Sequence, residues 1–320
     1  MNKISIAIII PVYNVGNYVK QTLDSVKNQL SNPDEVIVIN DGSTDNSGNI
    51  ISAYNHLENW RIIQKKNQGL GLTRNYGRSI AKSEYIYFLD SDDIIKNNLV
   101  LRLRELIQQN NKPDIILFSG ETFSEEKSVT NKVNLKFTLE GEYFRNDRLI
   151  TKLFKKKEIL PQSSRYITKN KLWIKNNLSY PKGIAEDEAL FFPLLALSER
   201  TLVIQEVLYM YRTGRKDSIT MSSLNINNTK DYLDRINNSI DFMKSNNKLI
   251  KNDKNAWNSR LERKGINLIT FCLKTDSTIY WKTIFTIFFI TKNIMYLFKI
   301  IWRILKFFLT KFLRINDYKS

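Results

Sequence analysis

The feature that most constrains the fold is an alternation of strand patterns with amphipathic helix patterns over the first 120 residues. Ile4–Ile10 is an almost continuous apolar run, which is typical of a strand buried on both faces of a parallel sheet. Val19, Leu23, Val26 and Leu30 then form the stripe of an amphipathic helix. The further expected strands are Glu35–Asn40, Trp60–Gln64, Glu84–Leu89 and Asp114–Ser119. This order predicts an α/β fold with a doubly wound, mostly parallel sheet.

Polar side chains follow three of these predicted strands at the point where each strand ends. Asn14 follows the first strand, Asp41 follows the second, and Asp90, Asp92 and Asp93 follow the fourth. Ligands of such sheets bind beyond the carboxyl ends of the strands. We therefore expect these oxygen ligands to converge at one edge of the sheet.

The amino-acid inventory excludes several kinds of site. The chain has a single histidine, His56, and a single cysteine, Cys272, so it has no intramolecular disulfide and no zinc site built from Cys and His. A Ser-His-Asp triad or a Cys-His dyad would have to use His56. A divalent metal would therefore sit mainly on carboxylates, which suits Mg²⁺ or Mn²⁺, and we expect the general base to be a carboxylate too.

The segment Asp90-Ser91-Asp92-Asp93 is the strongest local signal. Alternate residues of a strand project to one side, so Asp90 and Asp92 can face the same site, with Asp93 at the turn. Clustered carboxylates are unfavourable without a positive charge between them, and a divalent cation that binds a diphosphate would supply it. The alternative is a turn with a helix cap, because Asp and Ser are ordinary cap residues.

Two other segments are weaker signals when taken alone. Asp41-Gly42 is also a common turn signal. Gly69-Leu70-Gly71 has two glycines before a helix but lacks the full dinucleotide fingerprint, although phosphate could still approach the backbone there. Arg74 could make a charge-assisted contact with a phosphate, or it could be a surface cation of the helix.

Taken together, these motifs resemble those of the family 2 inverting glycosyltransferases, which have the GT-A fold and include enzymes of bacterial surface-polysaccharide synthesis. The resemblance covers roughly residues 4–220. It rests on the segments Ile8–Asn14, Val38–Asp45, Asn67–Gly77, Tyr87–Asp93, Tyr180–Gly183 and Glu186-Asp187.

The resemblance implies a role for each matching residue. The residues assigned to the nucleotide sugar are Pro11, Val12, Tyr13, Asp41, Arg74, Asp90 and Asp92. Asp92 and Asp93 would lie at a bound Mn²⁺ or Mg²⁺, which would offset the charge of the departing nucleoside diphosphate. Asp187 would be the general base that activates the acceptor hydroxyl. A single in-line displacement would invert the anomeric centre.

The position of the base leaves alternatives open. Glu186, Asp187 and Glu188 are consecutive, and a carboxylate at a helix start is often only dipole compensation. The preceding Tyr180–Gly183 favours Asp187. Some relatives place a histidine near the metal in the later half, and this chain has none there. Arg212, Arg215 or Lys216 could instead hold the diphosphate, a hypothesis based on charge.

The last part of the chain lies outside the resemblance. Residues 276–320 hold eight Lys or Arg and two Asp, which is +6 of the net +17 that 49 basic and 32 acidic residues give. On one helix over 279–315 the seven cations would share an arc of roughly 140°. The opposite face would hold Ile290, Ile294, Leu297, Phe298, Ile301, Trp302, Leu305, Phe308 and Phe312. This pattern predicts a helix lying in an anionic membrane interface; the alternative is packing on its own domain or in a dimer.

The sequence thus predicts a catalytic domain over 1–220, a helical extension over 221–275 and a basic amphipathic tail over 276–320. The predicted function is a metal-dependent transfer of a hexose-like sugar from a nucleotide sugar to a saccharide acceptor. A UDP-sugar is the favoured donor, and a lipid-linked saccharide is the expected acceptor. The alternatives are a nucleotidyltransferase and a non-catalytic membrane-bound sugar-binding protein. Without a signal-peptide pattern, we expect a cytoplasmic protein, peripheral on the inner membrane face, that does not bind nucleic acid.

Overall fold

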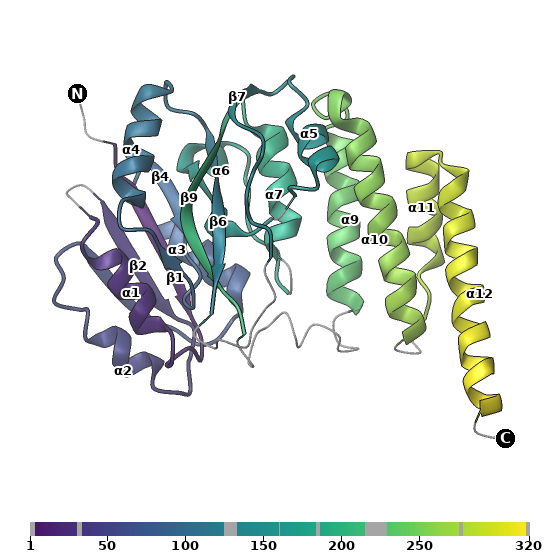
Figure 1. Ribbon diagram of the computed structural model, residues 1–320, viewed down its shortest axis with the longest axis horizontal. Helices are drawn as coiled ribbons and strands as arrows, with labels where there is room; N and C mark the ends of the chain where they lie inside the picture. The colour runs from purple at the N-terminus through teal and green to yellow at the C-terminus, as the bar shows by residue number, and fades with distance from the viewer. Residues whose placement is uncertain are drawn as a thin grey trace. The chain divides into compact units, whose positions relative to one another are not determined.

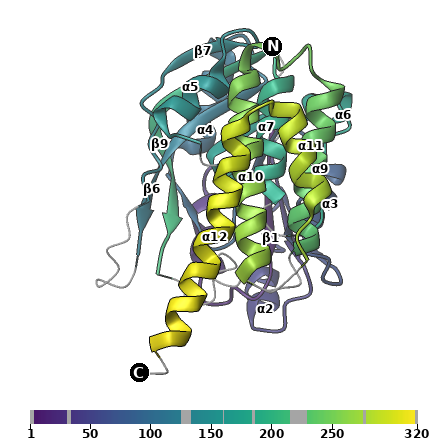
Figure 2. The same cartoon turned by 90° about the vertical axis from the view of Figure 1, so that its right-hand side faces the viewer.

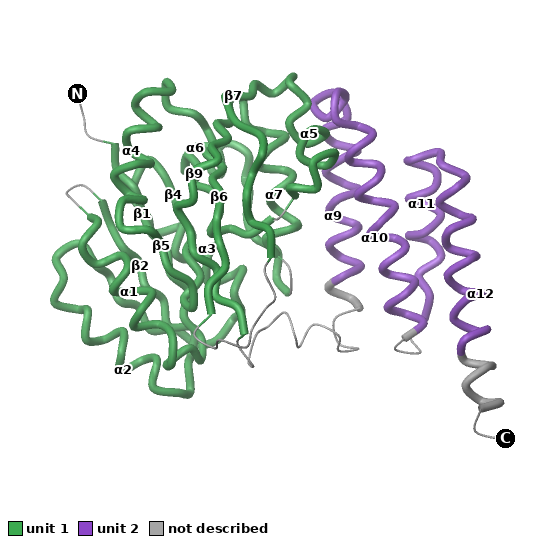
Figure 3. The backbone as a smooth tube through the Cα atoms, viewed as in Figure 1, with its two compact units in different colours: residues 1–216 green, residues 217–320 purple. Residues whose placement is uncertain are grey.

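The computed structural model describes residues 4–30, 34–124, 133–159, 161–183, 186–214, 229–274 and 278–317. The side chains of 229–231, 274 and 311–317 lie outside that description. The chain divides into two compact units, residues 1–216 and 217–320 (Figure 3).

Unit 1 is built on one sheet with the strand order β3-β2-β1-β4-β8-β6-β9-β5, and β7 pairs with β9 (Figure 1). Its strands are β1 (Ile6–Val12), β2 (Glu35–Asn40), β3 (Trp60–Gln64), β4 (Tyr85–Phe88), β5 (Ile94–Ile95), β6 (Ile115–Phe123), β7 (Gly141–Phe144), β8 (Tyr166–Lys169) and β9 (Arg200–Arg212). Its helices are α1 (Val19–Lys27), α2 (Ser47–Ser52), α3 (Leu70–Ile80), α4 (Leu99–Gln109), α5 (Leu149–Lys156), α6 (Asn170–Lys175) and α7 (Glu186–Leu197), with a 3-10 turn η1 (Ser163–Arg165).

The apolar run at the start of the chain forms the central strand of the parallel part of the sheet. All seven residues of β1 are buried, as expected of a strand covered on both faces. Ile10 pairs with Val38 of β2 and Ile9 pairs with Phe88 of β4, both in parallel register. Because β1, β2 and β4 run in the same direction, their carboxyl ends meet at one edge of the sheet.

Helices cover both faces of the sheet and make it doubly wound. One face packs against α1, α2 and α4, where Ile8 of β1 shares a core with Leu23 and Leu103 (Figure 1). On the other face, the ring of Phe88 lies 5.6 Å from that of Trp173 in α6, and α7 packs there against β8. The predicted α/β class is therefore confirmed.

The parallel pairing holds for β3, β2, β1 and β4, and the rest of the sheet is mixed. β8 runs antiparallel to both β4 and β6, whereas β6 and β9 are parallel. The segment Thr201–Tyr211, expected as a strand pair or extended segment, lies within the single strand β9, which has a register shift opposite Phe118 and Ser119. A strand expected over Phe137–Tyr143 appears later, as β7.

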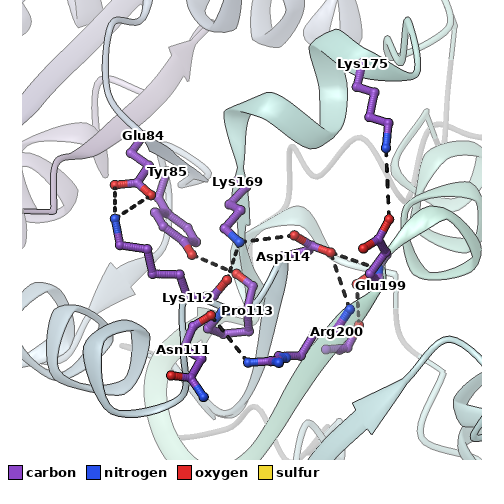
Figure 4. A network of polar contacts seen from close by, with 12 residues as sticks. Glu84, Tyr85, Asn111, Lys112, Pro113, Asp114, Lys169, Lys175, Glu199 and Arg200 are labelled. Atoms are coloured by element: carbon purple, nitrogen blue, oxygen red, sulfur yellow. Dashed lines mark hydrogen bonds and ion pairs between the residues drawn. The ribbon is translucent and has the colours of Figure 1, made fainter.

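A polar network fixes the sheet at the ends of β6 and β9 that lie opposite the predicted site (Figure 4). One carboxylate oxygen of Asp114 accepts a bond from Lys169 Nζ at 3.2 Å. The other accepts from the main-chain N–H groups of Glu199 at 2.8 Å and Arg200 at 3.3 Å. Asp114 thus ties the starts of β6 and β9 to the end of β8.

Unit 2 is helical in the residues that the structure describes. It contains α9 (Thr229–Ser245), a 3-10 turn η3 (Lys251–Asp253), α10 (Lys254–Lys274), α11 (Trp281–Thr291) and α12 (Ile294–Asp317). Both α11 and α12 pack against α10 (Figure 2). Within the described parts of the chain, no helix is both long and apolar enough to span a bilayer.

The single helix expected over 279–315 is wrong, because the structure has two helices there. Lys292 adopts a left-handed conformation with φ of 54°, and Asn293 then begins α12 by accepting the main-chain N–H of Met295 at 3.1 Å. The amide of Asn293 also donates to both carboxylate oxygens of Glu262 in α10, each at 3.0 Å. The turn is therefore anchored on unit 2 itself.

Gly77 of α3 offers a test of how closely helices pack on the sheet. A Cβ atom at this position would lie 2.5 Å from Ile9 Cγ2 and 2.8 Å from Ile39 Cδ1. Alanine would favour the helix but overpack this contact, so Gly77→Ala should lower the free energy of unfolding by about 1–3 kcal/mol in urea titrations. Ser79→Ala, on the exposed side of α3, is the control and should leave it nearly unchanged. Unaltered stability in Gly77→Ala would contradict this account of the packing.

Candidate active site

The loops that follow β1 and β2 are joined by hydrogen bonds from both sides. The main-chain N–H of Asn14 donates to Ser43 Oγ at 3.1 Å, and Thr44 N–H donates to Asn14 Oδ1 at 2.8 Å. Gly16 N–H donates to Asp45 Oδ2 at 2.8 Å. Asn14 adopts a left-handed backbone with φ of 51°, which Asn tolerates better than most residues. The two loops therefore form one rigid rim at the carboxyl edge of the sheet.

The residues predicted to line a nucleoside pocket differ in their solvent exposure. Pro11 and Val12 are buried at the end of β1, and Val12 has no exposed surface that a ligand could touch. The Val12 carbonyl already accepts the main-chain N–H of Asp41 at 2.8 Å. Tyr13 is 46% exposed, so its ring is accessible for stacking.

Asp41 is buried, and its carboxylate organises the loop before α3. Its two oxygens accept the main-chain N–H groups of Gln68 at 3.0 Å and Gly69 at 2.9 Å. Lys65 Nζ also forms an ion pair with this carboxylate. Gly69 has a φ of 95°, a conformation that glycine adopts most readily. Asp41 thereby sets the path of the chain into α3.

Arg74 joins three separate elements of the site. Its side chain is 2% exposed, with Nη1 bound to Glu186 Oε1 of α7 and Nη2 bound to Asp90 Oδ1 after β4, each at 2.5 Å. The guanidinium also lies 5.3 Å from the centre of the Tyr180 ring. Arg74 is therefore not a surface cation of the helix; it is a buried counter-ion shared by two carboxylates.

The start of α3 lies against the chain that leads into α7. A Cβ atom at Gly71 would come within 2.6 Å of the Pro181 carbonyl oxygen, so only glycine permits this approach. Asn75 and Tyr180 exchange two hydrogen bonds, each of 2.8 Å. The glycines of this segment, expected to let phosphate approach, thus also serve packing and backbone conformation.

Asp187 has the environment of a general base. It is half-buried in the first turn of α7, and its Oδ1 accepts the main-chain N–H of Glu188 at 2.7 Å. Burial, and then the neighbouring charge of Glu186, raise the pKa of Asp187 to about 7, although Arg74 opposes this rise. A carboxylate with such a pKa can accept a proton at neutral pH and later release it.

Asp93 lies below the turn that begins at Asp90, away from solvent. Its Oδ2 accepts the hydroxyl of Tyr209, and its Oδ1 accepts the main-chain N–H of Arg212 at 2.8 Å, both in β9. Burial, and then the charges of Asp92 and Asp90, raise the pKa of Asp93 well above its ordinary value. The carboxyl group of Asp93 therefore ties the turn to the sheet.

The buried side chain of Arg212 also binds the turn that begins at Asp90. Its Nε donates to the Asp92 carbonyl at 2.7 Å, and its Nη2 donates to Gln21 Oε1 at 2.5 Å. The guanidinium lies over the rings of Tyr18 and Phe123, at 5.0 and 4.5 Å. These contacts make Arg212 part of the scaffold around Asp92. The other two cations of the diphosphate hypothesis, Arg215 and Lys216, lie outside the described residues.

The acidic side chains of the site can be compared with the ligands that a divalent cation needs. Among the described residues, no group of three or more His, Cys, Asp and Glu side chains could hold a metal ion. Asp90 and Asp92 are both half-buried in one short turn and supply hard oxygen ligands. Mg²⁺ is commonly held by one or two carboxylates together with water and substrate phosphates. The turn therefore fits a cation that arrives with a diphosphate, but not an all-protein cage.

The structure brings most of the predicted residues to one edge. Arg74 links Asp90 to Glu186, and Asp187 adjoins Glu186 in α7. Asp41 reaches the same region through the loop into α3. Lys65, directly after β3, was missed as the ion-pair partner of Asp41, although its place at the end of the strand next to β2 is a usable signal.

Replacing Glu186 should change the acidity of Asp187. Glu186→Gln removes the adjacent negative charge and leaves Arg74 with one anionic partner fewer, so the pKa of Asp187 should fall below about 7. Carboxyl ¹³C chemical shifts followed through a pH titration would measure it. Glu199→Gln, at an exposed position, is the control and should leave that pKa in place. A pKa that stays constant in Glu186→Gln would contradict the electrostatic account.

Comparison with known proteins identifies relatives in sequence and in fold. The chain is 28% identical to Glycosyltransferase GlyG of Streptococcus pneumoniae over 72% of this chain and 77% of GlyG. It is 30% identical to Glycosyltransferase GlyA of the same organism over 67% of this chain but only 31% of GlyA. The fold is similar to that of S. aureus TarS residues 1–349 in complex with UDP-GlcNAc, with a TM-score of 0.67 and 18% identity, over 94% of this chain and 89% of that one.

The family model that matches is described as glycosyl transferase family 2, and it covers residues 7–171. That range contains β1 to β4, the rim formed by the loops after β1 and β2, Arg74 and the turn that begins at Asp90. It is more than half of the chain, and it confirms the resemblance seen in the motifs. The chain therefore belongs to glycosyl transferase family 2.

Proposed function

We propose that the protein is an inverting glycosyltransferase that moves a sugar from a nucleotide sugar to a hydroxyl group of a saccharide acceptor. The observation that carries the proposal is the buried Arg74, which joins Asp90 to Glu186 beside a carboxylate, Asp187, whose pKa is about 7. This arrangement puts a group able to accept a proton at the edge where the strands end. Membership of the family fits the same reaction class.

Asp187 is the general base of the proposed reaction. Its ionised carboxylate takes the proton of the acceptor hydroxyl while that oxygen bonds to the anomeric carbon. The bond from the anomeric carbon to the diphosphate breaks in the same step, and its electron pair leaves with the nucleoside diphosphate. One in-line displacement inverts the anomeric centre, so no covalent sugar–enzyme intermediate forms.

The donor site of this proposal lies along the rim and the turn after β4. Tyr13 stacks on the base, next to the buried Pro11 and Val12 at the end of β1, and Asp41 keeps the loop before α3 in place. A UDP-sugar is the favoured donor. The support is the likeness of the fold to TarS in complex with UDP-GlcNAc and, with a TM-score of 0.56, with UDP.

A Mn²⁺ or Mg²⁺ ion belongs to the donor side of the proposal. When bound, it would offset the negative charge that grows on the departing diphosphate. Asp92 would be its main protein ligand. Asp93, whose two oxygens each accept a hydrogen bond from β9, would act on the ion only indirectly, because it fixes the turn that carries Asp92.

The acceptor in this proposal is a growing saccharide on a lipid carrier, in the synthesis of a surface polysaccharide. Such a substrate places the protein at the inner face of the cytoplasmic membrane, as a peripheral protein. The excess of basic residues in 276–320 supports this placement, because anionic lipids attract such segments.

Two substitutions separate the base from the donor site. Asp187→Asn should lower transfer by about two to four orders of magnitude and keep donor affinity, because it removes only the proton acceptor. Asp92→Asn should weaken donor binding in Mn²⁺, and the difference from the unmodified protein should vanish in chelator. Calorimetric titration with UDP and a panel of nucleotide sugars measures donor affinity, and product formation with a saccharide acceptor measures transfer.

Glu188→Gln is the matched control for these substitutions, since it changes the next carboxylate of the same helix. It should retain transfer. Full activity in Asp187→Asn, together with a loss of activity in Glu188→Gln, would move the base to Glu188.

The reaction should also depend on pH in a defined direction. Because only the ionised form of Asp187 accepts a proton and its pKa is raised to about 7, transfer should increase with pH and level off above that value. The pH profile of kcat checks this expectation. A rate that is already at its plateau at about pH 5, where a carboxyl group with an ordinary pKa is ionised, would exclude Asp187 with this pKa as the base.

A further inference from the structure

Helix α12 has one face that packs within unit 2. Tyr296 and Ile300 are buried, and the Tyr296 hydroxyl lies so close to Gly265 of α10 that a Cβ atom there would come within 2.1 Å. From α11, Ile284 and Ile287 are buried as well. This packing accounts for only part of the apolar surface of the two helices.

The outer face of α12 is apolar and exposed from Ile294 to Leu309, which is about four turns of helix. Its large apolar side chains are between 53% and 68% exposed. They are Ile294, Met295, Phe298, Ile301, Trp302, Leu305, Phe308 and Leu309. At about 100° per residue, they fall within one continuous arc of roughly 140°, directly opposite the buried face. Contiguous apolar surface of this extent marks an interaction site in a folded protein.

Basic side chains lie along one flank of this outer face. Lys299, Arg303 and Lys306 are exposed on α12, and Lys282 and Lys292 are exposed on α11 and in the turn. No Asp or Glu occurs anywhere in residues 279–316. The surface therefore combines a wide apolar face with positive charge alone.

The charge distinguishes between the possible occupants of this surface. If the outer faces of two copies met, the apolar arcs would fit, but the cations would face one another with no carboxylate between residues 279 and 316 of either copy to pair with them. An anionic bilayer interface offers acyl chains to the apolar arc and negative headgroups to the flank. The cations recur every three or four residues, so such a helix lies along the interface.

We propose that the outer face of α12, flanked by Lys299, Arg303 and Lys306, is a docking surface for an anionic membrane interface. Trp281, Phe285 and Phe289 are further exposed aromatic residues of unit 2, on α11. The docking surface lies outside the catalytic unit and goes beyond the proposed reaction. It would hold the enzyme where a lipid-linked acceptor is presented, and only this last consequence rests on the proposed function.

Vesicle co-sedimentation of the full chain tests the surface without donor or acceptor. Phosphatidylcholine vesicles with phosphatidylglycerol should bind the protein, and vesicles of phosphatidylcholine alone should bind it at least about tenfold more weakly. Ile301→Ser with Leu305→Ser should weaken binding by at least about tenfold, because the two side chains no longer enter the apolar layer. These residues are exposed, so circular dichroism and UDP binding should stay unchanged.

The matched control uses one Leu and one Ile of similar exposure in unit 1. Leu101→Ser with Ile174→Ser should bind vesicles like the unmodified protein, since these residues are 58% and 66% exposed but lie on α4 and α6. For the charges, Lys299→Gln, Arg303→Gln and Lys306→Gln together should remove the preference for phosphatidylglycerol. Lys136→Gln, Lys155→Gln and Lys171→Gln, at exposed positions of unit 1, should keep it.

Three outcomes would overturn the proposal. The unmodified protein could fail to bind anionic vesicles, or both double variants could weaken binding equally. Light scattering could instead show a dimer that Ile301→Ser with Leu305→Ser dissociates, without vesicle binding, which would assign the surface to a second copy. Because vesicle binding is measured apart from transfer, a failed docking surface and a failed catalytic proposal are distinguishable.

Discussion

The site depends on one buried guanidinium with two anionic partners. Arg74 draws Asp90 and Glu186, which are 96 residues apart in the chain, onto a single side chain of α3. Removing one member of a buried ion pair leaves an uncompensated charge, at a cost of about 3–5 kcal/mol. The arrangement therefore fixes the distance between the end of β4 and the start of α7. In the proposed reaction, this distance separates the nucleotide-sugar site from the general base.

The remaining parts of the site are held by main-chain hydrogen bonds. Asp41 accepts two N–H groups of the loop into α3, and Asp93 accepts one from β9. Asp45 accepts one from the loop after β1. Each of these aspartates joins two segments that are distant in sequence, so acidic residues here act as structural ties as well as candidate ligands. The carboxylates of the candidate site are consequently carried by a preorganised edge, which is the arrangement that catalysis by positioning requires.

The sequence predicts the parallel half of the fold well, because strands buried on both faces have continuous apolar runs such as Ile4–Ile10. It also predicts that the polar residues after these strands converge, since parallel strands end at one edge. The antiparallel strand β8 was not predicted, and Thr201–Tyr211 was expected as a strand pair or extended segment but not as the single strand β9, because these pairings depend on contacts between distant segments. The burial of Arg74 was missed for the same reason: an isolated arginine in a helix gives no sign of two partners beyond its own helix. The turn at Lys292 and Asn293 depends on Glu262 of another helix.

The two close glycines of α3 have a consequence for how this segment is compared among relatives. Gly71 contacts the carbonyl oxygen of Pro181 in the chain before α7, and Gly77 packs against Ile9 and Ile39 of the sheet. A larger residue at either position would translate the whole helix, and with it the arginine that it carries. Retention of glycine at these two places is thus a steric requirement of the scaffold, and its presence in a homologue is no guide to phosphate binding.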